Sequence, residues 1–189
     1  MLKTFTAAAA AALLWSGASV AAPTPYTIES SHTYPSFEAP HMGISFWRGK
    51  FNKTSGSVEL DDAAKTGSVD ITIDATSVDF GHDKMNEHAK GDDFFNVAKY
   101  PTVAYKGKLV YTGATPSAVD GEMTLLGVTK PLKLKINSFK CITHPMLKKE
   151  VCGADAEGDF NRADFGMTKY ADGDAGKVKL RIQVEALKN

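Results

Sequence analysis

Several segments alternate apolar and polar residues with a period of two, and this pattern limits the fold more than any other feature. The clearest runs cover residues 69–73, 103–109, 132–136 and 178–184, with weaker versions at 58–60 and 119–125. Successive side chains of a β-strand point to opposite faces, so each run predicts an antiparallel strand with one apolar and one solvated side. About eight short strands of this kind predict an all-β protein, either a sandwich or a barrel, and periodicity alone does not choose between the two.

Turn-forming residues separate the runs. The segments rich in glycine, aspartate, asparagine and threonine, which we interpret as hairpin loops, are 52–56, 61–67, 112–116 and 172–176. One stretch breaks the β pattern: residues 82–90 are polar and lack β-branched side chains, which predicts a short helix ended by Gly91. We expect the turn after it to direct Phe94 and Phe95 inward.

The N-terminus has the features of a secretory signal peptide. Lys3 precedes a short apolar run at 6–14, and Ser19 and Ala21 supply the small residues of a cleavage site. The alternative is a membrane anchor, but the run is shorter than the ~20 residues that cross a bilayer. We therefore expect a signal peptide at 1–21, cleavage after Ala21, a single domain at 22–189 and a periplasmic location.

Charge and cysteine content argue against a nucleic-acid-binding protein and against a cysteine redox or metal site. The chain has 22 basic and 22 acidic residues, so no basic excess favours a nucleic-acid partner. Its two cysteines, Cys141 and Cys152, lack the CxxC spacing of redox and metal sites. In an oxidising compartment an even count favours a disulfide between them.

No motif in the chain predicts catalysis or metal binding. The sequence contains no GxSxG nucleophile elbow, no HExxH and no P-loop. His82 and His88 are six residues apart and lie on poorly matched faces of a helix, whereas zinc needs three or four converging ligands. We expect a protein that is not an enzyme and has no metal and no covalent cofactor.

Several segments, taken in order, carry a family resemblance. They are FEAPHMG at 37–43, GDDFFNVAKYP at 91–101, GEMTLLGVTKP at 121–131 and FNRADFGM at 160–167. Their order and spacing, from Tyr26 to about Leu187, resemble the YceI-like family of periplasmic, lipocalin-like proteins that bind polyisoprenoids. The cysteine loop at 141–153 is similar to that of a subgroup that holds ubiquinone.

The resemblance implies an extended antiparallel eight-stranded lipocalin-like β-barrel with a short helical insertion. It further implies a carrier whose cavity holds an isoprenoid quinone such as ubiquinone, or another polyprenyl lipid, without a covalent step. Many family members have an arginine–aspartate pair before the helical histidine, and here the segment reads HDKMNEH at 82–88.

The ligand contacts expected from the pattern and the resemblance are aromatic and aliphatic lining residues with a few polar groups. They are Phe37, His41, Phe51, His88, Phe94, Phe95, Tyr105, Met123, Leu125, Phe160 and Arg162. The roles of His41 and Arg162 each have an alternative interpretation, and the nearby Trp47 has a structural one. His41 either binds a ligand head or is satisfied by backbone groups, Arg162 either meets an anionic head or pairs with Asp164, and Trp47 is interpreted as packing.

Two other functions remain as alternatives. One is an enzyme acting on an isoprenoid or quinone, and the other is a stress-response interaction protein whose barrel is filled. The family resemblance is also compatible with a homodimer and with transient membrane contact.

Overall fold

The computed structural model describes residues 22–189, so the expected signal peptide at 1–21 lies outside the described residues. Residues 22–189 form eleven strands and one α-helix. The strands are β1 (Thr24–Ile28), β2 (Tyr34–His41), β3 (Ser45–Phe51), β4 (Thr54–Asp61), β5 (Thr66–Asp74), β6 (Val78–Asp79), β7 (Thr102–Thr112), β8 (Thr115–Leu125), β9 (Val128–Thr143), β10 (Glu150–Asn161) and β11 (Lys177–Lys188).

Eight strands close into an antiparallel barrel, as the resemblance implied. The ring runs β1-β4-β5-β7-β8-β9-β10-β11, and it closes because β1 also pairs with β11. In that closing seam Tyr26 lies opposite Lys188 and Ile28 opposite Ala186. A barrel leaves no free edge along this ring, which is how an all-β chain avoids edge-to-edge association.

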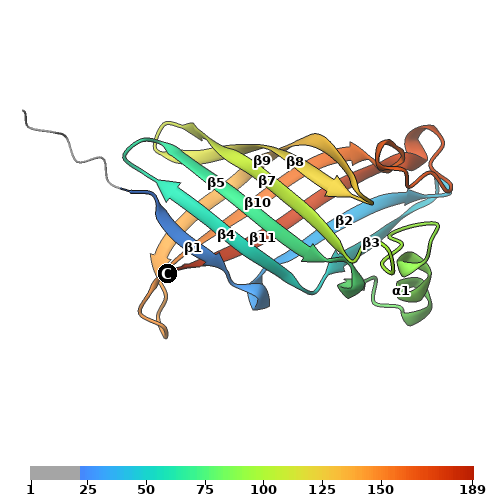
Figure 1. Cartoon of the computed structure of the whole chain (residues 1–189), viewed down its shortest axis with the longest axis horizontal. Coiled ribbons are helices and arrows are strands. Elements are labelled where there is room, and N and C mark those ends of the chain that lie inside the picture. Colours follow the sequence, from blue (N-terminus) through green and yellow to red (C-terminus); the bar gives the residue numbers. More distant parts are fainter. Residues whose placement is uncertain (1–21) are drawn as a thin grey trace, which may run out of the picture.

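Three of the eight strand paths are interrupted and continue as a second strand. The 3-10 turn η1 (Ser30–His32) separates β1 from β2, and η2 (Ala75–Ser77) separates β5 from β6. β2 pairs with β11 at 179–183, just beyond the stretch of β11 that pairs with β1. These continuations lengthen the barrel at one end (Figure 1).

The third interruption corrects one prediction. Residues 52–56 do not form a hairpin loop: only Asn52 and Lys53 break the path from β3 to β4, and Gly56 lies within β4 opposite Ile71. Gly56 has a φ of +140°, and a β-carbon there would collide with the carbonyl oxygen of Asp70. The glycine therefore permits a close strand approach rather than a turn. The loops at 61–67 and 112–116 are confirmed, and 172–176 lies in the longer connection between β10 and β11.

The helical insertion is confirmed with nearly the expected limits. Helix α1 covers Asp83–Lys90, His82 is its N-cap, and Gly91 follows its last turn. The backbone N–H of Met85 donates to Nδ1 of His82 over 3.3 Å, which satisfies one of the free donors at the helix start. The barrel end formed by α1, the β2–β3 hairpin and residues 162–176, called the α1 end below, lies opposite the C-terminus (Figure 1).

The opposite end carries the disulfide. Cys141 and Cys152 are bonded, as expected, and they face each other across β9 and β10. Cys152 is buried and packs with Tyr26, Leu60 and Ala186. The bond thus lies within the β9–β10 hairpin and packs beside the closing seam of the barrel. Between residues 22 and 189, no helix has the length and apolar character needed to cross a membrane.

Candidate functional site

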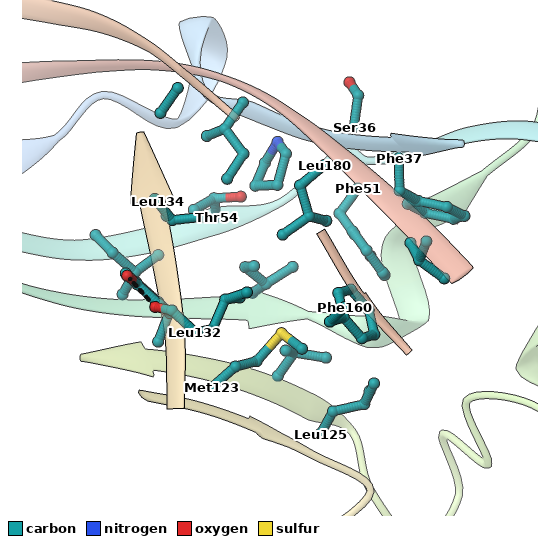
Figure 2. Close-up of a pocket in the computed structure, with 18 of the residues that line it drawn as sticks. Ser36, Phe37, Phe51, Thr54, Met123, Leu125, Leu132, Leu134, Phe160 and Leu180 are labelled. Carbon is teal, nitrogen blue, oxygen red and sulfur yellow. Dashed lines mark hydrogen bonds between the residues drawn. The ribbon is translucent and has the colours of Figure 1, made fainter. Parts of the chain in front are cut away.

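The barrel encloses a cavity of about 770 Å³ lined by the inward residues of its strands. Strand β9 shows how the sequence builds it: Leu132 and Leu134 face inward and are buried. Between and beside them, Lys133 pairs with Asp120 over 2.9 Å and Lys135 with Glu157 over 3.4 Å on the outer surface. The period-two pattern therefore separates an apolar interior from a charged exterior. Figure 2 shows labelled side chains from several strands, among them Met123, Leu132 and Leu180, directed into this space.

All eleven residues expected to contact a ligand line this cavity. Their role as ligand contacts stays a prediction. The structure adds lining residues that the sequence did not single out as contacts, among them Phe80, Ile71 and Leu180. Ile71 and Leu180 lie in the alternating runs, so extending the inward set along every run would have found both.

Aromatic rings gather near the α1 end. The ring of Phe51 lies 5.6 Å from Phe37 and 5.3 Å from Phe95, and Phe80 lies 5.5 Å from Phe37 (centroid distances). The Phe51–Phe95 and Phe37–Phe80 pairs are edge-to-face, and such contacts contribute about 0.5–1.5 kcal/mol each beyond the area they bury. Phe94 and Phe95 come from the turn after α1 and point inward, as expected. They form an aromatic wall for an apolar ligand.

Tyr105 belongs to the wall and offers little polar contact. Its hydroxyl lies 2.9 Å from the carbonyl oxygen of Leu132 and 3.4 Å from that of Val119, so its donor is used within the barrel. Burial raises the pKa of this phenol. A β-carbon at Gly121, on the neighbouring strand β8, would lie 2.6 Å from the tyrosine oxygen, so the glycine of the GEMTLLG segment makes room for this ring.

Two histidines and a tryptophan lie at the α1 end. The ring of His41 packs against Trp47 at 5.3 Å, and His88 packs edge-on against Phe94 at 4.9 Å. Trp47 packs as interpreted, but it also lines the cavity. Both histidines therefore present an imidazole among apolar surfaces.

Arg162 is buried and also lines the cavity. Its Nη1 donates to the carbonyl oxygen of Met167 over 3.0 Å and its Nη2 to that of Tyr170 over 2.8 Å. Removal from water lowers the pKa of the guanidinium, and no carboxylate among residues 22–189 acts as its ion-pair partner. The alternative of a surface pair with Asp164 is wrong, because the start of the 162–176 connection turns the arginine inward.

One buried polar atom of the interior has no partner. Thr54 is 3% exposed and lines the cavity, and its Oγ1 makes no hydrogen bond within residues 22–189. An unpaired buried hydroxyl costs about 1–3 kcal/mol. Sequence reasoning misses this position, because residues 52–56 have the composition of a loop.

The cavity is open at the α1 end and covered at the other. Three lining residues at the α1 end are also exposed: Met42 at 80%, Tyr170 at 71% and Trp47 at 36%. At the opposite end, the lining residues Tyr26, Leu60 and Cys152 are each under 7% exposed. The α1 end is therefore the more accessible end of the cavity.

The chain matches the family model of the YceI-like domain over residues 26–186. Protein YceI of Escherichia coli O6:H1 is 31% identical over 189 residues, covering 99% of this chain and 98% of that protein.

Solved structures share the fold. The crystal structure of BcnA from Burkholderia cenocepacia superposes with a TM-score of 0.68 at 22% identity, over 84% of this chain and 98% of that one. A polyisoprenoid-binding domain from Saccharophagus degradans superposes with a TM-score of 0.63 at 14% identity, over 87% and 98%.

Proposed function

The chain belongs to the YceI-like family, and on that premise we propose that it binds a polyisoprenoid lipid whose tail occupies the barrel cavity. The observation that carries the proposal is the apolar cavity of about 770 Å³, open at the α1 end. Pockets of this size enclose most of a ligand's surface. The description of the Saccharophagus degradans domain as polyisoprenoid-binding is in line with it.

The energetics favour a long tail. Each methylene moved from water into such a cavity contributes about 0.8 kcal/mol. About fifteen buried carbons give a gross gain of about 12 kcal/mol, which offsets an association cost of about 4–15 kcal/mol. A small sugar has no comparable apolar surface to bury.

We infer that the ligand is an isoprenoid quinone, such as ubiquinone, and that its quinone ring, the head group, is held at the α1 end. A quinone ring is uncharged and carries oxygen acceptors. The imidazoles of His41 and His88 line the cavity there, and Arg162 adds a positive group beside them. These three side chains supply the donors that such oxygens need.

Binding without catalysis is the simpler use of this site. No aspartate, glutamate, lysine or free thiol of residues 22–189 lines the cavity, and its two histidines, His41 and His88, pack against separate aromatic rings rather than against an acidic partner. The barrel is also not filled, which disfavours the alternative of a solid interaction protein. We further propose a periplasmic carrier role, which the disulfide between Cys141 and Cys152 supports.

Lipid extraction tests the proposal directly. Protein purified from its native host should release a prenyl lipid detected by mass spectrometry in about one copy per chain. Refolded, delipidated protein should take up a prenyl quinone in a titration. Repeated recovery of lipid-free protein together with no uptake in the titration would refute the proposal.

A further inference from the structure

The β2–β3 hairpin exposes an unusual set of apolar side chains. Met42 is 80% exposed, Ile44 81% and Phe46 55%, next to Trp47 at 36%. Residues 40–47 contain no charged residue. Contiguous exposed apolar surface on a soluble protein marks an interaction site.

The hairpin tip is a tight turn. The backbone N–H of Ile44 donates to the carbonyl oxygen of His41 over 3.1 Å, and Met42 and Gly43 have φ values of 55° and 73°. A β-turn with positive φ at both central residues is compatible with the twist of a hairpin. The apolar tip is thus held outward by local backbone geometry.

This exposed surface is continuous with the cavity. His41, Met42 and Trp47 line the cavity, while Ile44 and Phe46 next to them do not. Apolar contacts therefore run without interruption from solvent at the tip to the interior. The same surface that meets a partner also forms the entrance for a ligand.

The small size of the exposed tip favours a lipid bilayer over a protein as its partner. A stable protein interface involves about 20–30 residues a side, and the tip offers a handful. A bilayer requires no matching surface, and tryptophan and phenylalanine are favourable at the level of its headgroups. Arg48 and Lys50 follow the tip on β3 and are exposed; Arg48 pairs with Glu38 over 3.3 Å, which leaves Lys50 as the cation that can face an anionic headgroup layer.

We propose that the β2–β3 hairpin docks the protein on a phospholipid bilayer, with the cavity entrance against the membrane. The docking stands on the exposed tip alone. Its use, passing lipid between membrane and cavity, rests on the proposed function. The hairpin is therefore a docking element as well as a wall of the cavity.

The chain provides a matched control at the opposite end. In the β9–β10 hairpin, Met146 is 81% and Leu147 54% exposed, nearly the same as Ile44 and Phe46. Neither lines the cavity. The two double variants, Ile44→Ser with Phe46→Ser and Met146→Ser with Leu147→Ser, remove equal apolar exposure at opposite ends.

The test uses residues 22–189 and vesicles of phosphatidylethanolamine with a minority of phosphatidylglycerol. Trp47 is the single tryptophan of this part of the chain, so its fluorescence reports on the hairpin. We expect a blue shift on adding vesicles and quenching by brominated lipids. The Ile44/Phe46 variant should partition about tenfold or more weakly, whereas the Met146/Leu147 variant should bind like the wild type.

Three results would overturn the proposal: no vesicle binding, loss of binding in the Met146/Leu147 variant, or a dimer in sedimentation that the Ile44/Phe46 variant dissociates. Titration with a water-dispersible, short-tailed quinone separates this proposal from the proposed function. Quinone binding without vesicle binding rejects the docking surface alone. Vesicle binding without quinone binding supports the docking surface while rejecting the ligand.

Discussion

The guanidinium of Arg162 lies over the ring of Phe94, with its central carbon 5.9 Å from the ring centroid. The two residues come from different connections, one after α1 and one after β10, and both line the cavity. The contact joins the two connections that frame the open end of the barrel. Its geometry is that of a cation–π interaction.

Replacing Arg162 should loosen this end. Arg162→Met leaves the carbonyl oxygens of Met167 and Tyr170 without their donors. We expect a loss of about 2–4 kcal/mol in the free energy of unfolding, measured by urea denaturation. Amide exchange in 162–176 should accelerate.

Arg181→Met is the control for Arg162→Met, because Arg181 pairs with Glu157 on the outer surface with its side chain 51% exposed. This change should cost less than about 1 kcal/mol. Equal losses in the two variants would contradict the structural role of Arg162.

Filling the cavity should abolish lipid binding. Ala156 on β10 is buried and lines the cavity, so Ala156→Phe places a ring in the space proposed for the tail. Ala104→Phe on β7 makes the same change at a residue that does not line it. Mass spectrometry of bound lipid should show loss in the first variant and retention in the second; full occupancy of Ala156→Phe would argue against a tail in the barrel.

Two buried threonines should respond in opposite directions to the same substitution. Thr54→Val removes a hydroxyl with no partner, so stability should stay constant or rise by up to about 1 kcal/mol. Thr33→Val removes the acceptor of the Glu185 N–H and the donor to the Glu185 carbonyl, and it should cost about 1–2 kcal/mol. Thermal unfolding of both variants gives the comparison, and a large loss for Thr54→Val would reveal a partner for its hydroxyl.

The disulfide should stabilise the barrel by closing a short loop. Its cysteines are 11 residues apart, for which the chain-entropy model gives about 2–3 kcal/mol. The double variant Cys141→Ala with Cys152→Ala should lose about that much in urea denaturation. A reductant should destabilise the wild type by a similar amount and leave the double variant unchanged; sensitivity of the double variant would point to another cause.

Acid should weaken a contact at the closing seam. The hydroxyl of Tyr26 donates to Glu150 over 2.6 Å, and this bond, together with Lys188, lowers the pKa of Glu150. A carboxyl whose pKa is lower in the folded state stabilises fully above its unfolded value and loses that contribution as pH falls through the folded value.

Glu150→Gln should therefore be less stable than the wild type near neutral pH, and the difference should shrink below about pH 4. Because the Glu150 side chain is 41% exposed, we expect less than about 1 kcal/mol. Urea midpoints across this pH range measure it. If the stability difference between Glu150→Gln and the wild type grew on acidification, it would contradict a lowered pKa of Glu150 in the folded state.

The alternation of apolar and polar residues along the sequence predicted most strands and many of the residues that line the cavity. The period-two runs placed Leu132, Leu134 and Val178 inward, and the polar stretch placed the helix within a residue of its observed start. Turn composition misled at 52–56, because a glycine required for close strand approach has the same composition signal as a turn.

The sequence by itself determined which side of each strand is apolar, where the helix lies and which cysteines join. These depend on near neighbours and on residue type. Tertiary structure alone decided the rest: that Tyr26 meets Lys188 to close the ring, that Arg162 turns inward to two carbonyl oxygens, and that the interior stays hollow. Strand pairing between distant segments and the volume left inside a closed ring depend on how all strands pack together, and no local periodicity encodes them.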